Sequence, residues 1–177
     1  MRLRGAGIVA AMLALVLVSA CGSKKIVSRP MERESFRNIS ELYARAEVVV
    51  EGVVAATSAG SSYGSGHGAV QARNVTVTPI EFFKGPSTSS VVMEERGWEG
   101  ATPIEVEGYP PSYVGERAFW FLIHGFNTAN YVVINSQSTY ALTVTGDLVP
   151  VGGQHDALSE LIDSYDPDQF REELRDQ

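Results

Sequence analysis

Hydrophobic positions change their spacing along the chain, and each change marks a new kind of element. Segment 38–46 has its apolar residues at helical spacing and opens with Asn38, three residues before Glu41, as in a capping box. We therefore expect a short helix there. From residue 48 onward, β-branched and aromatic residues alternate or form short apolar runs, which is typical of strands. Strands are expected at 48–55, 69–83, 90–94, 118–123 and 131–134, followed by a hairpin of 140–145 and 148–151 about Gly146-Asp147.

Glycine, serine and proline mark the connections between these strands. Segment 57–68 is rich in glycine and serine, and segment 96–116 contains several glycines and Tyr109-Pro110-Pro111, so both are predicted to be loops. Pro79 lacks a backbone donor and therefore marks an edge or a bulge within its strand. Lys84-Gly85-Pro86 is predicted to be a turn.

The carboxyl-terminal region returns to helical spacing. An apolar stripe at i, i+3, i+4 and i+7 predicts one helix, and Asp166, Pro167 and Gln169 form the start signal of a second. The stripe consists of Leu158, Leu161, Ile162 and Tyr165. Many short strands with flanking helices indicate a mainly β domain, a small barrel or sandwich.

Composition excludes several classes of protein. The chain has 177 residues, 44% hydrophobic and 20% charged, as in one globular domain. One cysteine cannot supply a disulfide framework or a Cys-cluster metal site. A net charge of −7 argues against a nucleic-acid partner, because phosphates require a basic surface.

The amino terminus has the pattern of a secretion signal. Arg2 and Arg4 precede an apolar run at 8–18, which is too short to span a bilayer. Val18-Ser19-Ala20-Cys21 then resembles the lipobox of bacterial lipoproteins. The resemblance implies that residues 1–20 are removed and that Cys21 carries a lipid anchor. The alternatives are an ordinary secretory signal, with Cys21 incidental, or a retained membrane helix.

The rest of the chain is divided by composition. Residues 21–37 are polar and are predicted to be a flexible tether, in which Lys24, Lys25 and Arg29 face anionic headgroups or solvent. A β-barrel domain is predicted at 38–152, and a helical segment at 153–177.

Three segments carry a second resemblance. Residues 46–54, 81–85 and 115–122, in this order, are similar to bacterial extracytoplasmic domains with an OB-fold like that of the tissue-inhibitor-of-metalloproteinases and netrin modules. The resemblance implies a Greek-key OB-like β-barrel with a binding surface and no catalytic residue. The zinc-chelating free cysteine of the eukaryotic inhibitors is not carried over, because Cys21 would be acylated and has no cysteine partner.

Two groups of residues are candidates for chemistry or binding. Gly60-Ser61-Ser62-Tyr63-Gly64 fits G-x-S-x-G, but a β pattern and no helix follows it, so a nucleophile elbow is not expected. A hydrolase using Ser62 and His67 stays as the second hypothesis. His67, His124 and His155 lack metal-site spacing, so no metal or cofactor is expected.

Aromatic residues of the second predicted loop favour binding. Trp98, Tyr109 and Tyr113 either contact a partner or fold back to cap the barrel. Together with Ser62, Tyr63 and His67 they are the candidate binding residues. We expect a non-enzymatic module of the bacterial cell envelope, anchored to the extracytoplasmic face of the membrane through lipid, with an envelope protein as partner. An inhibitor or accessory partner of an envelope enzyme is a further alternative.

Overall fold

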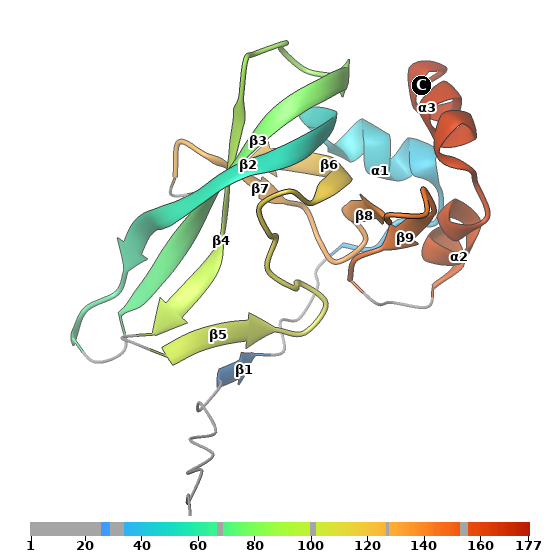
Figure 1. Cartoon of the computed structure of the whole chain (residues 1–177). Coiled ribbons are helices and arrows are strands. Elements are labelled where there is room, and N and C mark those ends of the chain that lie inside the picture. Colours follow the sequence, from blue (N-terminus) through green and yellow to red (C-terminus); the bar gives the residue numbers. More distant parts are fainter. Residues whose placement is uncertain (1–25, 29–33, 67–68, 100–101, 127, 153–155) are drawn as a thin grey trace, which may run out of the picture.

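The computed structural model describes residues 26–28, 34–66, 69–99, 102–126, 128–152 and 156–177 (Figure 1). Within these ranges the chain is mainly β, as expected, with strands in one region and helices gathered on one side. The elements are β1 (Ile26–Ser28), α1 (Ile39–Arg45), β2 (Val48–Tyr63), β3 (Val70–Lys84), β4 (Val91–Glu99), β5 (Thr102–Val106), β6 (Arg117–His124), β7 (Tyr131–Val133), β8 (Thr139–Leu142), β9 (Leu148–Pro150), α2 (Ala157–Asp163) and α3 (Pro167–Arg175).

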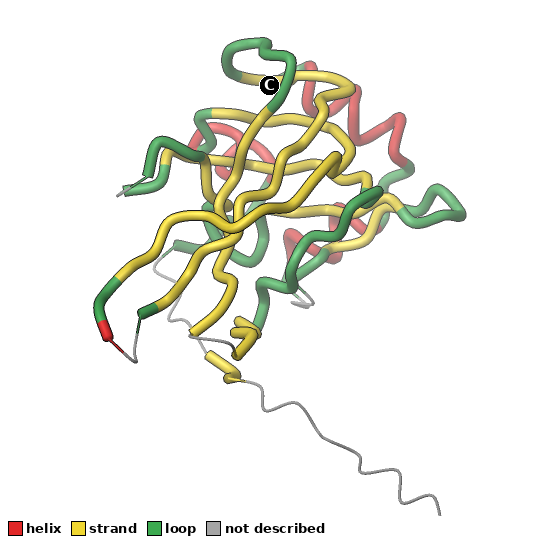
Figure 2. The backbone as a smooth tube through the Cα atoms, turned by 60° about the vertical axis from the view of Figure 1, so that its left-hand side comes forward, coloured by secondary structure: helices red, strands yellow, loops and turns green. Residues whose placement is uncertain are grey.

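The described strands form one curled sheet in the order β1-β5-β4-β3-β2-β6-β8-β9. β7 lies outside this path and pairs with both β4 and β6. Strands β2, β3, β4, β7 and β6 therefore follow one another around a partly closed ring (Figure 2). The β4–β7 pairing is parallel and rests on the single pair Met93↔Tyr131, whereas the other pairings in the ring are antiparallel.

The prediction of a loop at 57–68 is wrong over most of its length. Residues 57–63 continue β2 and pair with β3 as far as Tyr63↔Val70. Cross-strand pairing outweighs the weak strand preference of glycine and serine here. Gly60 also fits a close approach, since a Cβ atom on it would lie 2.8 Å from Asn74 Oδ1.

The prediction of one irregular stretch at 96–116 is also wrong in its first half. β4 continues to Glu99, opposite the extended end of β3, and β5 follows at once in an antiparallel pairing with β4. β4 extends because the long β3 offers it a partner, and the extended β4 in turn pairs with β5; the glycine-rich sequence reveals neither pairing.

The bulge and turn predictions are confirmed. Glu51 pairs with Glu81 but Gly52 pairs with Pro79, so β3 contains an extra residue at the proline. Gly85 and Gly146 both have φ of +90°, which the turns after β3 and between β8 and β9 require.

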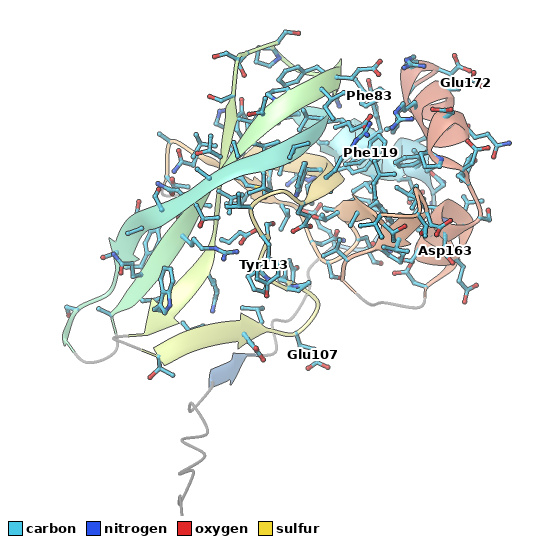
Figure 3. The ribbon with its side chains drawn as sticks, in the orientation of Figure 1. Phe83, Glu107, Tyr113, Phe119, Asp163 and Glu172 are labelled. Atoms are coloured by element: carbon cyan, nitrogen blue, oxygen red, sulfur yellow. The ribbon has the colours of Figure 1, made fainter. Side chains whose placement is uncertain are left out.

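Two hydrophobic cores lie on opposite sides of β2 and β6. Along β6, Phe119 and Phe121 pack toward the helices, whereas Ala118, Trp120 and Leu122 pack inside the ring. Figure 3 shows Phe119 between the strands and the helical layer. A strand that supplies both cores is apolar at every position, which explains the continuous hydrophobic run at 118–122.

Helices α1 and α3 begin where their capping residues predict. Asn38 Oδ1 accepts from Glu41 N, but Glu41 binds the Arg37 backbone, so the capping box of α1 is not completed. The capping box of α3, formed by Asp166 and Gln169, is complete. In α2, Leu158 and Ile162 are fully buried, whereas Leu161 of the predicted stripe is 41% exposed.

Part of the expected tether is structured. Residues 26–28 form β1, which pairs in parallel with β5 through Ile26↔Ile104 to Ser28↔Val106. Phe36 packs against the helical core, and its backbone N donates to Gln137 Oε1 at 2.8 Å. Cys21 and the predicted signal peptide lie outside the described residues. Among the residues that are described, no helix has the length and apolar character needed to cross a bilayer.

Candidate functional site

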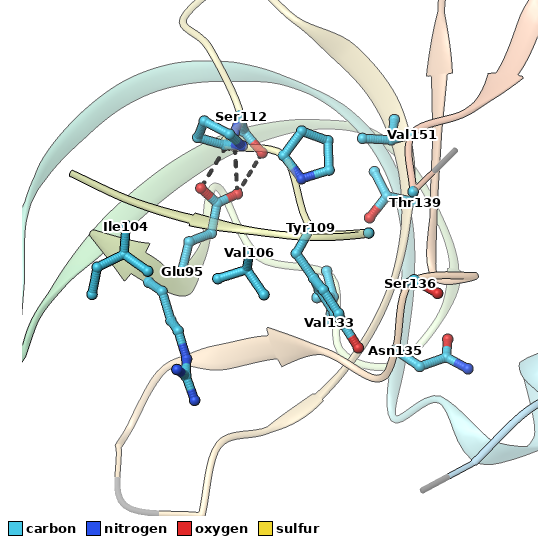
Figure 4. Close-up of a pocket in the computed structure, with 15 residues that line it drawn as sticks. Glu95, Ile104, Val106, Tyr109, Ser112, Val133, Asn135, Ser136, Thr139 and Val151 are labelled. Atoms are coloured by element: carbon cyan, nitrogen blue, oxygen red, sulfur yellow. Dashed lines mark hydrogen bonds between the residues drawn. The ribbon is translucent and has the colours of Figure 1, made fainter. Parts of the chain in front are cut away.

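A pocket of about 270 Å³ opens between the β4–β5 pair and the segments that lead into β8 and out of β9 (Figure 4). Its apolar lining comes from Ile104 and Val106 of β5, Val133 of β7, Val151 after β9, and the Tyr109-Pro110-Pro111 turn. Glu95, Arg96, Ser112, Asn135, Ser136 and Thr139 supply its polar lining. A small concave site with an apolar body and a few polar groups is the usual form of a ligand site.

A tight turn places Tyr109 in this pocket. Tyr109 N donates to the Val106 carbonyl at 2.9 Å, and Gly108 between them has φ of +80°. The Tyr109 side chain extends along the pocket between Val106 and Val133 (Figure 4). The sequence-predicted aromatic residue therefore lines a cavity, together with valines that the sequence did not mark.

Glu95 is held in place at one wall. Its carboxylate accepts from Ser112 Oγ at 2.5 Å and from Ser112 N at 3.2 Å, and it forms an ion pair with Arg73. Ser112 is only 6% exposed, so these bonds form away from bulk water. The negative charge of Glu95 is therefore compensated within the protein.

Arg96, the next residue, is different. It is exposed and lines the same pocket. Each of the other described arginines and lysines has an ion pair or a hydrogen bond, whereas Arg96 has neither to any described residue. The pocket thus has an available guanidinium at its edge.

A second hollow adjoins the pocket across Glu95 and Arg96. Tyr63, Val70, Ala72 and Glu94 line it together with these two residues. The Tyr63 hydroxyl donates to Glu94, and this bond, together with burial, raises the pKa of Tyr63. Tyr63, a predicted binding residue, therefore lines this second hollow and not the pocket around Tyr109.

Burial also perturbs a carboxyl near Glu95. Burial raises the pKa of Glu116, and the charge of Glu95 raises it further, despite a hydrogen bond from Tyr113 N that acts in the opposite direction. This residue holds the turn before β6 and does not line the pocket.

The other predicted site residues are dispersed. Ser62 is an exposed strand residue of β2, opposite Gln71. Trp98 is a half-buried residue of β4, and Tyr113 is 66% exposed on the turn before β6 (Figure 3). His67 and His155 lie outside the described residues. Among the candidates that the structure describes, Tyr109 lines the pocket described above, whereas Ser62, Tyr63, Trp98 and Tyr113 do not.

His124 contacts the carboxylate of Glu47 and belongs to no group of metal-ligating side chains among the described residues. Its Nδ1 bonds to Glu47, which lowers the pKa of Glu47, and its ring lies 4.4 Å from that of Tyr131. Across the described ranges, no three side chains of the metal-ligating types come together.

Sequence reasoning missed most of the pocket. Ile104 and Val106 fall in a segment expected to be irregular, although their alternation is a strand signal. The sequence around Glu95 and Ser112 gives no sign of their hydrogen bond. That bond depends on how β4 packs against the segment that holds Ser112, which is distant in the sequence.

Comparison with known proteins gives no relative from which a role could be transferred. No protein-family model matches the chain, and neither the curated proteins nor the solved structures contain a match.

Proposed function

We propose that this protein is a lipid-anchored, extracytoplasmic binding module of a bacterial cell envelope, without catalytic activity of its own. The observation that carries the proposal is the apolar pocket around Tyr109, which combines a hydrophobic interior with fixed polar groups.

We also propose that the ring of strands is an OB-like barrel. The support is its order β2-β3-β4-β7-β6, in which β7 joins β4 in parallel and β6 in antiparallel orientation. A five-stranded, partly open Greek-key barrel has a ligand-binding face and loops. The pocket uses β4 and β7, the two strands where the ring is closed by one pair.

The proposed anchor at Cys21 would hold the pocket close to the membrane. Ile26 is five residues beyond Cys21, and β1 pairs with β5, whose Ile104 and Val106 line the pocket. Five extended residues span at most about 17 Å. An acylated Cys21 would therefore keep the pocket close to the surface of the bilayer. The partner of the protein would then be another component of the envelope.

The alternative of a hydrolase gains no support from the described residues. Ser62 lies within a strand, and no strand-to-helix turn presents it. Replacing Ser62 and His67 by alanine and assaying model esters, glycosides and peptides tests this alternative directly.

The binding proposal is tested by methyl NMR of the purified full chain mixed with phosphatidylcholine bilayer discs. We expect a neutral apolar probe, 1-decanol, to shift the methyl signals of Ile104, Val106 and Val133, and to leave Leu158 and Ile162 of the helical core unchanged. Val151→Phe should fill the pocket and abolish the shifts. Val144→Phe, on the exposed β8–β9 turn, is the matched control and should preserve them. Equal shifts in both variants, or none in the wild type, would contradict the proposal.

A further inference from the structure

We infer that the pocket accepts an amphiphile with one anionic head, a carboxylate or a phosphate, whose head binds Arg96 while its apolar chain lies along Tyr109. This inference deepens the proposed function and rests on the pocket being a binding site.

The charge at the pocket edge determines the type of head. The protein is acidic overall, with a net charge of −7, and its described cations are otherwise engaged by carboxylates or backbone carbonyls. Arg96 alone among the described lysines and arginines has no such partner, and it is at the pocket. A guanidinium presents a planar fork of donors that matches a carboxylate or a phosphate.

The neighbouring carboxylate does not cancel this preference. Both oxygens of Glu95 are occupied, one by Ser112 Oγ and the other by Arg73, and Ser112 N adds a further donor. Because Glu95 is neutralised by Arg73, it neither needs Arg96 nor repels an anion as strongly as a free carboxylate would. A cationic head, in contrast, would be repelled by Arg96. Glu95 would attract it only weakly, because Glu95 is already paired with Arg73.

The apolar lining of the pocket determines the part of the ligand that lies beyond its head. Ile104, Val106, Tyr109, Val133 and Val151 give the pocket an apolar wall, and its volume of about 270 Å³ lies just below the usual range for ligand sites, which favours a small ligand. An apolar chain buried there gains by leaving water, whereas a fully polar anion would leave the wall uncovered. The combination favours a single-headed amphiphile over an inorganic anion or a peptide.

The test compares probes that share one chain length and differ in the head. Decanoate, decyl phosphate, 1-decanol and decyltrimethylammonium are titrated into the full chain with phosphatidylcholine discs, and binding is followed through the pocket methyls. We expect both anions to bind about tenfold more tightly than the alcohol, the factor that one charge-assisted hydrogen bond supplies, and the cation to bind most weakly.

Two arginine variants separate the role of Arg96 from that of overall charge. Arg96→Gln should remove the preference for anions, so that decanoate and decyl phosphate bind no more tightly than 1-decanol. Arg37→Gln, which removes an equal charge at an exposed ion pair before α1, should preserve the preference. Equal binding of all four probes, or loss of the preference in both variants, would overturn the inference and leave the binding module intact. Failure of every probe to shift the pocket methyls would remove the binding site itself.

A further arm distinguishes the source of the head group. Discs that contain phosphatidylglycerol, with no added amphiphile, should shift the same methyls if the ligand is a membrane lipid. A response to decanoate or decyl phosphate alone identifies a free amphiphile.

Discussion

The carboxylate of Glu51 on β2 is joined to the guanidinium of Arg171 on α3, with Nε–Oε2 of 2.7 Å and Nη2–Oε1 of 2.8 Å. Glu51 is completely buried, and Arg117 of β6 donates to the same Oε1. The Arg171 guanidinium also lies over the Phe119 ring, with Cζ 5.7 Å from its centroid. This ion pair joins the last helix, α3, to strand β2 of the sheet.

Removal of the Glu51 charge should therefore loosen α3. We expect Glu51→Gln to reduce the free energy of unfolding by about 3 kcal/mol, because breaking a buried ion pair leaves its partners without a counter-charge. Urea unfolding measures the loss. Glu41→Gln, which disrupts the exposed ion pair with Arg37, is the control and should cost much less. Comparable losses in the two variants would show that the buried pair has no special role.

The same pair should make stability depend on acidity. Burial alone would raise the pKa of Glu51, but hydrogen bonds from Arg171 and Arg117 outweigh it and hold the pKa below the ordinary value of 4.5. A carboxyl with a lowered pKa in the folded state stabilises fully above its unfolded pKa and loses that contribution as the pH falls through the folded value. The free energy of unfolding should thus decrease below about pH 4.5. Urea titrations at several pH values should show a shallower decrease in Glu51→Gln; identical slopes would refute this assignment.

The side chain of Gln137 should hold the segment before α1 against the rest of the described structure. Its side chain, only 3% exposed, accepts from Phe36 N and donates to the Phe36 carbonyl at 3.1 Å and to Asp156 Oδ2 at 2.8 Å. Gln137→Ala leaves these groups without partners, so we expect a loss of about 2 kcal/mol and faster hydrogen exchange at the Phe36 amide. Gln177→Ala, at the exposed carboxyl terminus, should change neither quantity. Unaltered exchange at Phe36 in Gln137→Ala would mean that other contacts hold the segment.

Gly52 should be intolerant of any side chain. A Cβ atom there would lie 2.5 Å from Val77 Cγ1 and 2.7 Å from the Thr78 carbonyl oxygen, where β2 meets the bulge of β3. We expect Gly52→Ala to cost about 2–3 kcal/mol, as overpacking does. Gly115→Ala is the comparison, because its φ of +90° is strained but the space around it is open, so its cost should be about 1 kcal/mol. The midpoint of thermal unfolding should fall further in Gly52→Ala than in Gly115→Ala. The reverse order would show that β2 and β3 separate easily at the bulge.

Local signals predicted the elements that local chemistry determines. Asp166, Pro167 and Gln169 marked the start of α3, and Pro79 marked the bulge in β3, because a cap and a missing donor act within a few residues. The extension of β2 through Gly60 was missed, since its stability comes from pairing with β3 rather than from its own residues.

The pocket was predictable only in part for the same reason. Tyr109 was selected as an aromatic residue on a glycine- and proline-rich segment, and it does line the pocket. Trp98 and Tyr113 shared that signal, but strand pairing and the turn before β6 place them elsewhere. Val133 and Val151 join Tyr109 only through the order of strands, which the periodicity of the sequence does not reveal.

We propose that a lipid at Cys21 holds the pocket beside a membrane. Metabolic labelling with radioactive palmitate, followed by separation of membrane and soluble fractions, tests it most directly. We expect a labelled wild-type protein in the membrane fraction, and an unlabelled Cys21→Ser variant that is no longer held there by lipid. A wild type without label, or label retained on Cys21→Ser, would contradict it.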